Sequence, residues 1–135
     1  MHVIVAAKVL IVVGDEGLVL RNSDTHPRWP LKGDLPGGTM EDGETIEAGL
    51  LREVLEETGI ALEPASVKQQ YATTKSNDEV TVVYHFYVSR QEAKPDVVLD
   101  WEHDQYEWVK LDEIQGVEAP YQEGIDHSLK VGLLT

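Results

Sequence analysis

The stretch GTMEDGETIEAGLLREVLEETGI, residues 38–60, decides the fold. A glycine-containing turn leads into a segment that predicts a helix over 45–58, with Thr45 as its N-cap and Gly59 where a C-terminal glycine belongs. On a helical wheel the apolar residues gather on one side, with Ile46 and Ala48 at its margins. That apolar side consists of Leu50, Leu51, Val54 and Leu55.

The opposite side of this predicted helix carries three glutamates. Glu53, Glu56 and Glu57 fall within an arc of about 100°, and Glu53 stands one turn from the other two. Like charges at this spacing repel, and helix formation does not require them. Two such glutamates would be ordinary surface residues, whereas three behind a glycine turn favour a hard divalent cation such as Mg²⁺ or Mn²⁺, which prefers oxygen ligands.

The same residues resemble a Nudix box. Its pattern is Gly38, five residues, Glu44, seven residues, Arg52-Glu53, an aliphatic residue, any residue, Glu56-Glu57, any residue, glycine and an aliphatic residue. Every constrained position matches over residues 38–60, and Leu35-Pro36-Gly37 before them is also usual for the family. The match is specific because many constrained positions recur at fixed spacing.

The resemblance implies an α/β/α sandwich around a mixed sheet, with a loop–helix–loop motif that supports metal-dependent hydrolysis of a nucleoside diphosphate linked to another group. It implies that Arg52 pairs with Glu44 and holds the glycine loop against the helix. The general base stays open between Glu53, Glu56 and a glutamate in a later loop. The implied catalytic residues are Arg52, Glu53, Glu56 and Glu57, and the implied metal ligands are Gly38 (through its carbonyl), Glu53, Glu56 and Glu57.

The rest of the chain reads as strands around one further helix. Residues 3–13 form an apolar, β-branched run interrupted by Lys8, which predicts a buried strand. Residues 14–17 predict a turn, 22–34 a loop, and 121–134 a closing helix. Further strands are expected at 18–21, 67–75, 79–89 and 106–111. Strands dominate and the helices are separated, so the expected class is α+β with a mixed sheet, in a single domain over 1–135.

A second acidic cluster comprises Asp100, Glu102, Asp104 and Glu107, just before Trp108. In short Nudix enzymes a further metal ligand often precedes such a tryptophan, which makes Glu102 the predicted fifth metal ligand. The alternative is a solvated acidic loop. His103 is predicted to be a surface histidine, since hard Mg²⁺ prefers oxygen.

Four residues outside the box are candidates for substrate binding: Arg21, Arg28, Trp29 and Lys32. The cations could contact phosphates and Trp29 could stack on a base, although Arg21 could equally be a surface residue and Trp29 a lid on the core. On the strand expected at 79–89, Tyr84, Phe86 and Val88 alternate with His85 and Tyr87. Neighbouring residues of a strand point to opposite faces, so one of these two sets is expected to face inside. Core packing is the favoured role for these aromatics and for Tyr71, ahead of a base pocket.

The charge balance is strongly acidic, with 25 acidic against 11 basic side chains and a formal net charge of −14. Such a field argues against duplex nucleic acid and anionic membranes as partners, but bound cations would still admit a small nucleotide. The chain has no cysteine, which fits a reducing compartment. Neither a signal peptide nor an apolar segment long enough to span a membrane is evident, so a cytoplasmic monomer or homodimer is expected.

The leading hypothesis is a Mg²⁺-dependent pyrophosphohydrolase, with Mn²⁺ able to substitute, that splits a nucleoside triphosphate into monophosphate and pyrophosphate. Alternatives within the family are a hydrolase of nucleotide sugars or of dinucleoside polyphosphates. An alternative of another class is a nucleotide-sensing module without turnover, against which the intact glutamates argue. A metal-buffering protein is a third and weaker hypothesis.

Overall fold

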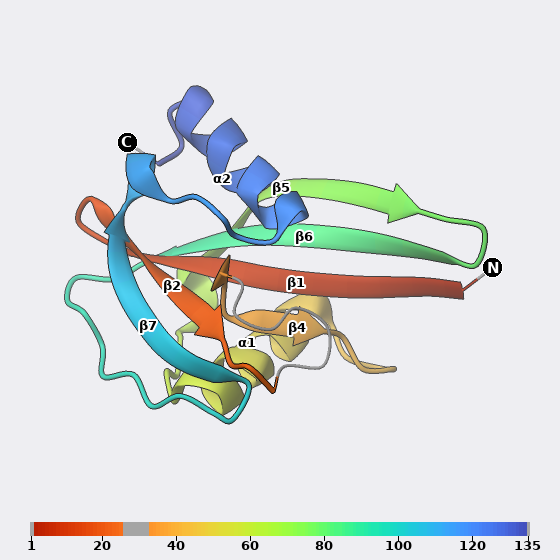
Figure 1. Ribbon diagram of the computed structural model, residues 1–135, viewed down its shortest axis with the longest axis horizontal. Helices are drawn as coiled ribbons and strands as arrows, with labels where there is room; N and C mark the ends of the chain where they lie inside the picture. The colour runs from red at the N-terminus through yellow and green to blue at the C-terminus, as the bar shows by residue number, and fades with distance from the viewer. Residues whose placement is uncertain (1, 26–32, 135) are drawn as a thin grey trace.

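The computed structural model describes residues 2–25 and 33–134 and shows a twisted mixed sheet with a helix on each face (Figure 1). The described strands are β1 (His2–Val13), β2 (Glu16–Asn22), β3 (Gly33–Asp34), β4 (Gly37–Thr39), β5 (Val67–Ser76), β6 (Val80–Arg90) and β7 (His103–Lys110). The helices are α1 (Ile46–Thr58) and α2 (Ala119–Lys130), with short 3₁₀ turns η1 (Pro64–Ser66) and η2 (Leu111–Glu113). The α+β class with a mixed sheet is confirmed.

Strand β1 is the centre of the sheet. It pairs in parallel with β6 from His2 to Val12, and antiparallel with both β2 and β4. The main strand order is β3-β2-β1-β6-β5, with β4 attached to β1 and β7 attached to β2. A strand covered on both faces is expected to read as a continuous apolar run, which is what residues 3–13 show apart from Lys8.

Two hydrophobic clusters lie on opposite faces of the sheet. Alternate residues of β1 divide between them, since Val9 belongs to the α1 side and Leu10 to the α2 side. Leu50 and Val54 of α1 complete the first cluster, and Tyr121 and Ile125 of α2 complete the second. The helices therefore fix both faces of the sheet, and the loops between β4 and α1 lie at its margin (Figure 1).

Helix α1 has the predicted ends. Thr45 Oγ1 accepts a hydrogen bond from the amide of Ala48 at 3.2 Å, and Gly59 ends the helix in the left-handed region with φ +72°. The predicted apolar side is only partly right, because Leu55 is 52% exposed. Glu57, predicted to lie on the polar side, is buried instead, since β4 passes directly over it.

Other segments differ from the predictions at their ends. The predicted loop over 22–34 includes the end of β2 and a short strand β3, which pairs antiparallel with β2. Strand β7 begins at His103 rather than 106, because its polar first residues still pair with Arg21 and Asn22 of β2. Helix α2 spans Ala119–Lys130 rather than 121–134, with Pro120 in its first turn, where a missing amide hydrogen is tolerated.

Both faces of β6 are buried, so the prediction that only one set of its alternating residues faces inside is wrong. Phe86 and Val88 pack in the α2 cluster, with Tyr84 at its margin, while Tyr87 packs in the α1 cluster. Tyr71 also packs against the α2 cluster, in agreement with a core role. Among the described residues, no helix is long and apolar enough to cross a membrane.

Candidate active site

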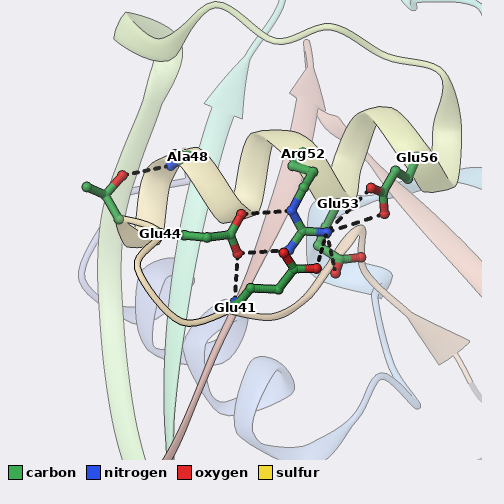
Figure 2. Close-up of polar contacts among 7 residues, drawn as sticks. Glu41, Glu44, Ala48, Arg52, Glu53 and Glu56 are labelled. Carbon is green, nitrogen blue, oxygen red and sulfur yellow. Dashed lines mark hydrogen bonds and ion pairs between the residues drawn. The ribbon is translucent and has the colours of Figure 1, made fainter.

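Arg52 on the outer face of α1 is surrounded by four glutamates, of which Glu53 and Glu56 belong to the helix and Glu41 and Glu44 to the loop before it (Figure 2). These five residues are here called the Arg52 cluster. Arg52 donates from Nε and Nη2 to the two carboxylate oxygens of Glu44, both at 2.8 Å. Its Nη1 lies 3.1 Å from Glu53, 3.4 Å from Glu56 and 3.8 Å from Glu41. The hydrogen bonds from Arg52 lower the pKa of Glu44 to about 2. The predicted Arg52–Glu44 pair is present and holds the loop before α1 to the helix.

Strand β4 brings the backbone of Gly37 against Glu57. The Gly37 amide donates to Glu57 Oε1 at 2.8 Å, and Gly37 has φ +138°, which favours glycine. A Cβ atom there would lie 2.6 Å from Lys8 Cα, so no other residue fits without displacing β1. Glu57 is only 5% exposed, and its burial raises its pKa to about 8, against the opposing charge of Lys8.

Gly38 lies against the carboxylate of Glu53. A Cβ atom on Gly38 would stand 2.9 Å from Glu53 Cδ and 3.1 Å from each of its oxygens. Burial raises the pKa of Glu53, although Arg52 opposes the shift. The two consecutive glycines therefore allow backbone and carboxylates to approach closely at one point, as a metal and phosphate site requires.

Glu53 and Glu57 line a cavity of about 410 Å³, here called the glutamate cavity, together with Gly38 and Glu102. The structure thus brings together Glu102 and two of the box glutamates from separate parts of the chain. Glu56 does not line this cavity. Its side chain is 58% exposed and faces Arg52 on the outer side of α1 (Figure 2). The sequence pattern places all three glutamates on one polar side, whereas in the structure Glu57 is buried and Glu56 is exposed.

Two residues that line the glutamate cavity, Lys8 and Asp34, begin a row of charged side chains that continues away from it, here called the buried ion chain: Lys8, Asp34, His103 and the partly exposed Asp100. The Lys8 ammonium pairs with Asp34 Oδ1, and Asp34 Oδ2 lies 3.2 Å from His103 Nε2. His103 Nδ1 lies 3.1 Å from Asp100 Oδ1. The prediction of a surface histidine is wrong, because His103 is buried between two carboxylates.

The charged side chains of the buried ion chain stabilise one another. Burial alone would lower the pKa of His103, but its hydrogen bond with Asp34 and the neighbouring Glu57 and Asp100 raise it. Both ring nitrogens can donate only when the ring is protonated, and both face carboxylate oxygens here. Burial would also lower the pKa of Lys8, but the charges of Asp34, Glu57 and Glu118 raise it. The carboxylates around Lys8 and His103 therefore favour the protonated forms of both side chains.

The donor set around the glutamate cavity suits a hard divalent cation. Glu53, Glu57 and Glu102 offer carboxylate oxygens, and Gly38 brings the backbone to the carboxylate of Glu53. A second grouping places single ligand atoms of Glu57, Asp100 and His103 within 4.8 Å of one another. Since both His103 nitrogens are engaged by carboxylates, the oxygen atoms are the better ligands in this region.

A second cavity of about 510 Å³ adjoins the first and has a more apolar wall. It extends between the loop before α2 and the sheet, where Val117 and Pro120 line it. The two cavities share Asp34, Tyr84 and Glu118, so together they form a continuous cleft from the glutamates to α2.

Of the four predicted substrate-binding residues, the structure describes Arg21, which is not brought together with the glutamates. Arg21 donates from Nε and Nη2 to Asp104 at 3.1 and 3.0 Å and lines a different cavity. Arg28, Trp29 and Lys32 lie outside the described residues. The members of the second acidic cluster have different partners. Asp100 contacts His103, Glu102 lines the glutamate cavity, and Asp104 pairs with Arg21.

Sequence reasoning missed Lys8 and Asp34 as parts of this site. Lys8 carried a signal, because a lone lysine inside a buried apolar strand must find a partner. Asp34 carried none beyond its place next to the Leu35-Pro36-Gly37 run, since its partners Lys8 and His103 lie 26 and 69 residues away.

Comparison with known proteins agrees with this geometry. A family model described as NUDIX domain matches residues 3–130. A MutT-like protein of Streptomyces ambofaciens is 41% identical over 66 residues, a match that spans 47% of this chain and only 40% of that protein. The solved MutT protein of Methanosarcina mazei Go1 is 26% identical with a TM-score of 0.82, covering 97% of this chain and 96% of that one. A MutT NUDIX hydrolase of Burkholderia pseudomallei, 23% identical, superposes with a TM-score of 0.77 over 93% and 98% of the two chains and supports the fold.

Proposed function

The chain belongs to the Nudix family, and we propose that it is a Mg²⁺-dependent pyrophosphohydrolase that splits a nucleoside triphosphate into monophosphate and pyrophosphate. One observation carries the proposal. Two box glutamates, Glu102 and the backbone of Gly38 converge on one cavity that continues into a more apolar one. A charged end and an apolar end are what a polyphosphate attached to a nucleoside needs.

The divalent cation is assigned to the carboxylates of Glu53, Glu57 and Glu102, with the Gly38 carbonyl and the outer glutamate Glu56 as further ligands. The ion would neutralise phosphate charge and lower the pKa of a bound water. Burial raises the pKa values of Glu53 and Glu57, so a positive charge bound beside them would favour their ionised forms. The oxygen-rich donor set and these raised pKa values support the assignment of a divalent cation.

Within this proposal Glu53 accepts the proton of the attacking water. It lines the glutamate cavity, whereas Glu56 faces solvent beside Arg52. Arg52 orients Glu53 through a 3.1 Å contact while its other nitrogens hold Glu44.

The second cavity is proposed to accept the nucleoside. Tyr84 lies where the two cavities meet and offers an aromatic surface, and Pro120 and Val117 line the wall beyond it. The volume of about 510 Å³ falls in the range of small-molecule sites.

The test is pyrophosphate and phosphate release from a panel of nucleoside triphosphates, nucleotide sugars and dinucleoside polyphosphates, with Mg²⁺ or with EDTA. We expect Mg²⁺-dependent release from at least one triphosphate and a loss of about 10²–10⁴-fold in kcat for Glu53→Gln. Glu63→Gln is the matched control, because Glu63 is exposed and lies outside both cavities.

The outcomes separate the alternatives. Turnover of a nucleotide sugar or a dinucleoside polyphosphate alone would keep the hydrolase and replace the substrate class. Nucleotide binding without metal-dependent turnover, in protein with a cooperative thermal transition, would favour the sensing module. Full activity of Glu53→Gln would contradict the assignment of the base.

A further inference from the structure

The glutamate cavity is lined by five carboxylates and, among the described residues, by a single lysine or arginine. The carboxylates are Asp34, Glu53, Glu57, Glu102 and Glu118, and the cation is Lys8. A triphosphate carries several negative charges into this cavity. A metal ion offsets part of that repulsion, and among the residues that the structure describes Lys8 is the lysine that adds positive charge to the wall.

The Lys8 ammonium has unused hydrogen-bond donors. An ammonium has three N–H groups, and within the described part of the chain its one hydrogen bond goes to Asp34 Oδ1. Glu118 Oε2 lies at 3.9 Å, beyond hydrogen-bond distance, and the Tyr121 ring centroid lies at 5.7 Å. All three neighbours line the cavity, so Nζ lies at the cavity wall with donors to spare.

The surrounding residues fix the position of this ammonium. Its stem rises from the middle of β1 and is held by Gly37, where a Cβ atom would approach Lys8 Cγ to 2.9 Å. Asp34, its partner, is itself fixed, since Oδ1 accepts from the Leu35 amide at 2.8 Å and Oδ2 faces His103 at 3.2 Å. The side chain of Lys8 is 12% exposed. A group held this firmly loses little conformational entropy when it binds a ligand.

A second residue of the cavity wall also offers an unused hydrogen-bond donor. The hydroxyl of Tyr121 is buried and has no hydrogen-bond partner among the described residues, and Tyr121 lines the same cavity. Buried hydroxyl groups are nearly always hydrogen-bonded in native proteins, so an unsatisfied one at a cavity wall points to a ligand or a water. Two adjacent unsatisfied donors favour an acceptor-rich ligand.

We propose that Lys8 binds a phosphate group of the substrate directly, as the protein's own cationic contact in the glutamate cavity. The assignment deepens the proposed function, on which it rests for the nature of the ligand. Asp34 and His103 act on it as positioning residues, because they hold the ammonium in place without contacting the phosphate themselves. Lys8 thus serves phosphate binding, while the carboxylates of Glu53, Glu57 and Glu102 serve the metal.

The test measures phosphate binding without a base or a cleavable nucleotide. Inorganic tripolyphosphate with Mg²⁺ is titrated by calorimetry into the wild type and into Lys8→Met/Asp34→Asn. This double variant removes one positive and one negative charge, so the net charge stays at −14. The matched control is Lys94→Met/Glu16→Gln, which removes an ion pair of 2.6 Å that lines none of the described cavities.

We expect the Kd for tripolyphosphate to rise about 10-fold to 100-fold in Lys8→Met/Asp34→Asn, which corresponds to one lost hydrogen bond to a charged group. The control should bind within about twofold of the wild type, and Mn²⁺ binding without phosphate should stay unchanged in both. A merely structural role for Lys8 would instead weaken Mn²⁺ and tripolyphosphate binding together. If the double variant lacks a cooperative thermal transition, Lys8→Gln, which keeps a hydrogen-bond donor at this position, replaces it.

Unchanged tripolyphosphate affinity in the Lys8 variants, or no binding by the wild type, would overturn the inference. Neither result bears on the nucleotide panel, so the proposed function would stand if the wild type still released pyrophosphate. Conversely, Lys8-dependent tripolyphosphate binding with no nucleotide turnover would keep Lys8 as a phosphate ligand and remove the hydrolase.

Discussion

The Arg52 cluster and the buried ion chain are built from the same chemical groups but at different depths. In the first, an arginine on the outer face of α1 holds carboxylates that are in part exposed, at 3.8 Å or less (Figure 2). In the second, Lys8 and His103 meet Asp34 within the protein, with both of those cations largely screened from water. Water screens the first set, whereas in the second each charge depends on its neighbours.

This difference indicates at which ion pairs a substitution lowers the free energy of unfolding most. Exposed pairs contribute little because water competes for both partners. Removing one partner of a buried pair leaves an uncompensated charge, which is strongly destabilising. We therefore expect substitutions in the buried ion chain to affect folding far more than equivalent substitutions around Arg52.

The largest effect is expected for Asp34→Ala. This substitution leaves the Lys8 ammonium and the His103 ring without their shared carboxylate, so the free energy of unfolding should fall by about 3–5 kcal/mol, measured by urea denaturation. Asp104→Ala, which breaks the exposed pair with Arg21, should cost less than about 1 kcal/mol. Equal losses for the two variants would contradict the distinction by depth.

The next effect concerns pH in metal-free protein. When a carboxyl group has a higher pKa in the folded state than in the unfolded state, the free energy of unfolding falls as the pH rises from the unfolded pKa to the folded pKa. For Glu57 that window runs from about 4.5 to about 8. The raised pKa of His103 acts in the same direction, since its contribution is present below about 6.5 and is lost as the pH rises through the folded value.

We therefore expect the free energy of unfolding in EDTA to fall between pH 5 and 8, and Glu57→Gln to reduce that fall by about 2–4 kcal/mol. The measurement is urea denaturation at several pH values for both proteins. Parallel pH profiles for the wild type and Glu57→Gln would show that the buried carboxylate is not the source of the dependence.

The smallest effect is expected at Arg52. Arg52→Lys keeps the charge but loses the two-point contact with Glu44, so the free energy of unfolding should fall by about 1 kcal/mol or less. Arg21→Lys, which loses a similar two-point contact with Asp104, is the matched control. A loss at Arg52 comparable to that of Asp34→Ala would place the Arg52 cluster among the interactions that the fold depends on.

The same contrast explains how much could be predicted from the sequence. Residues 38–60 revealed α1 and its caps, because capping residues and helical spacing are local in the sequence. The Arg52–Glu44 pair was implied by the family resemblance, since Glu44 precedes the helix and helical spacing does not relate it to Arg52. The strands followed from apolar patterning, and the class from their order. The burial of Glu57 did not follow, because it depends on where β4 crosses α1.

The buried ion chain could not be assembled from the sequence for a physical reason. Lys8 and His103 meet Asp34 only after β1, β3 and β7 have joined one sheet, and no local spacing encodes that pairing. Glu102 was singled out through a family resemblance, and its place in the glutamate cavity supports that choice without testing its role as a ligand.

The parallel pairing of β1 with β6 has a consequence for how the chain folds. His2 pairs with Val80 and Val12 with Arg90, so each contact closes a loop of nearly eighty residues. During synthesis β1 therefore emerges long before its main partner exists, and its apolar residues remain without that cover until β6 follows. Folding should therefore be slow for a chain of this size. Nascent chains should aggregate most readily in the interval before β6 has been synthesised.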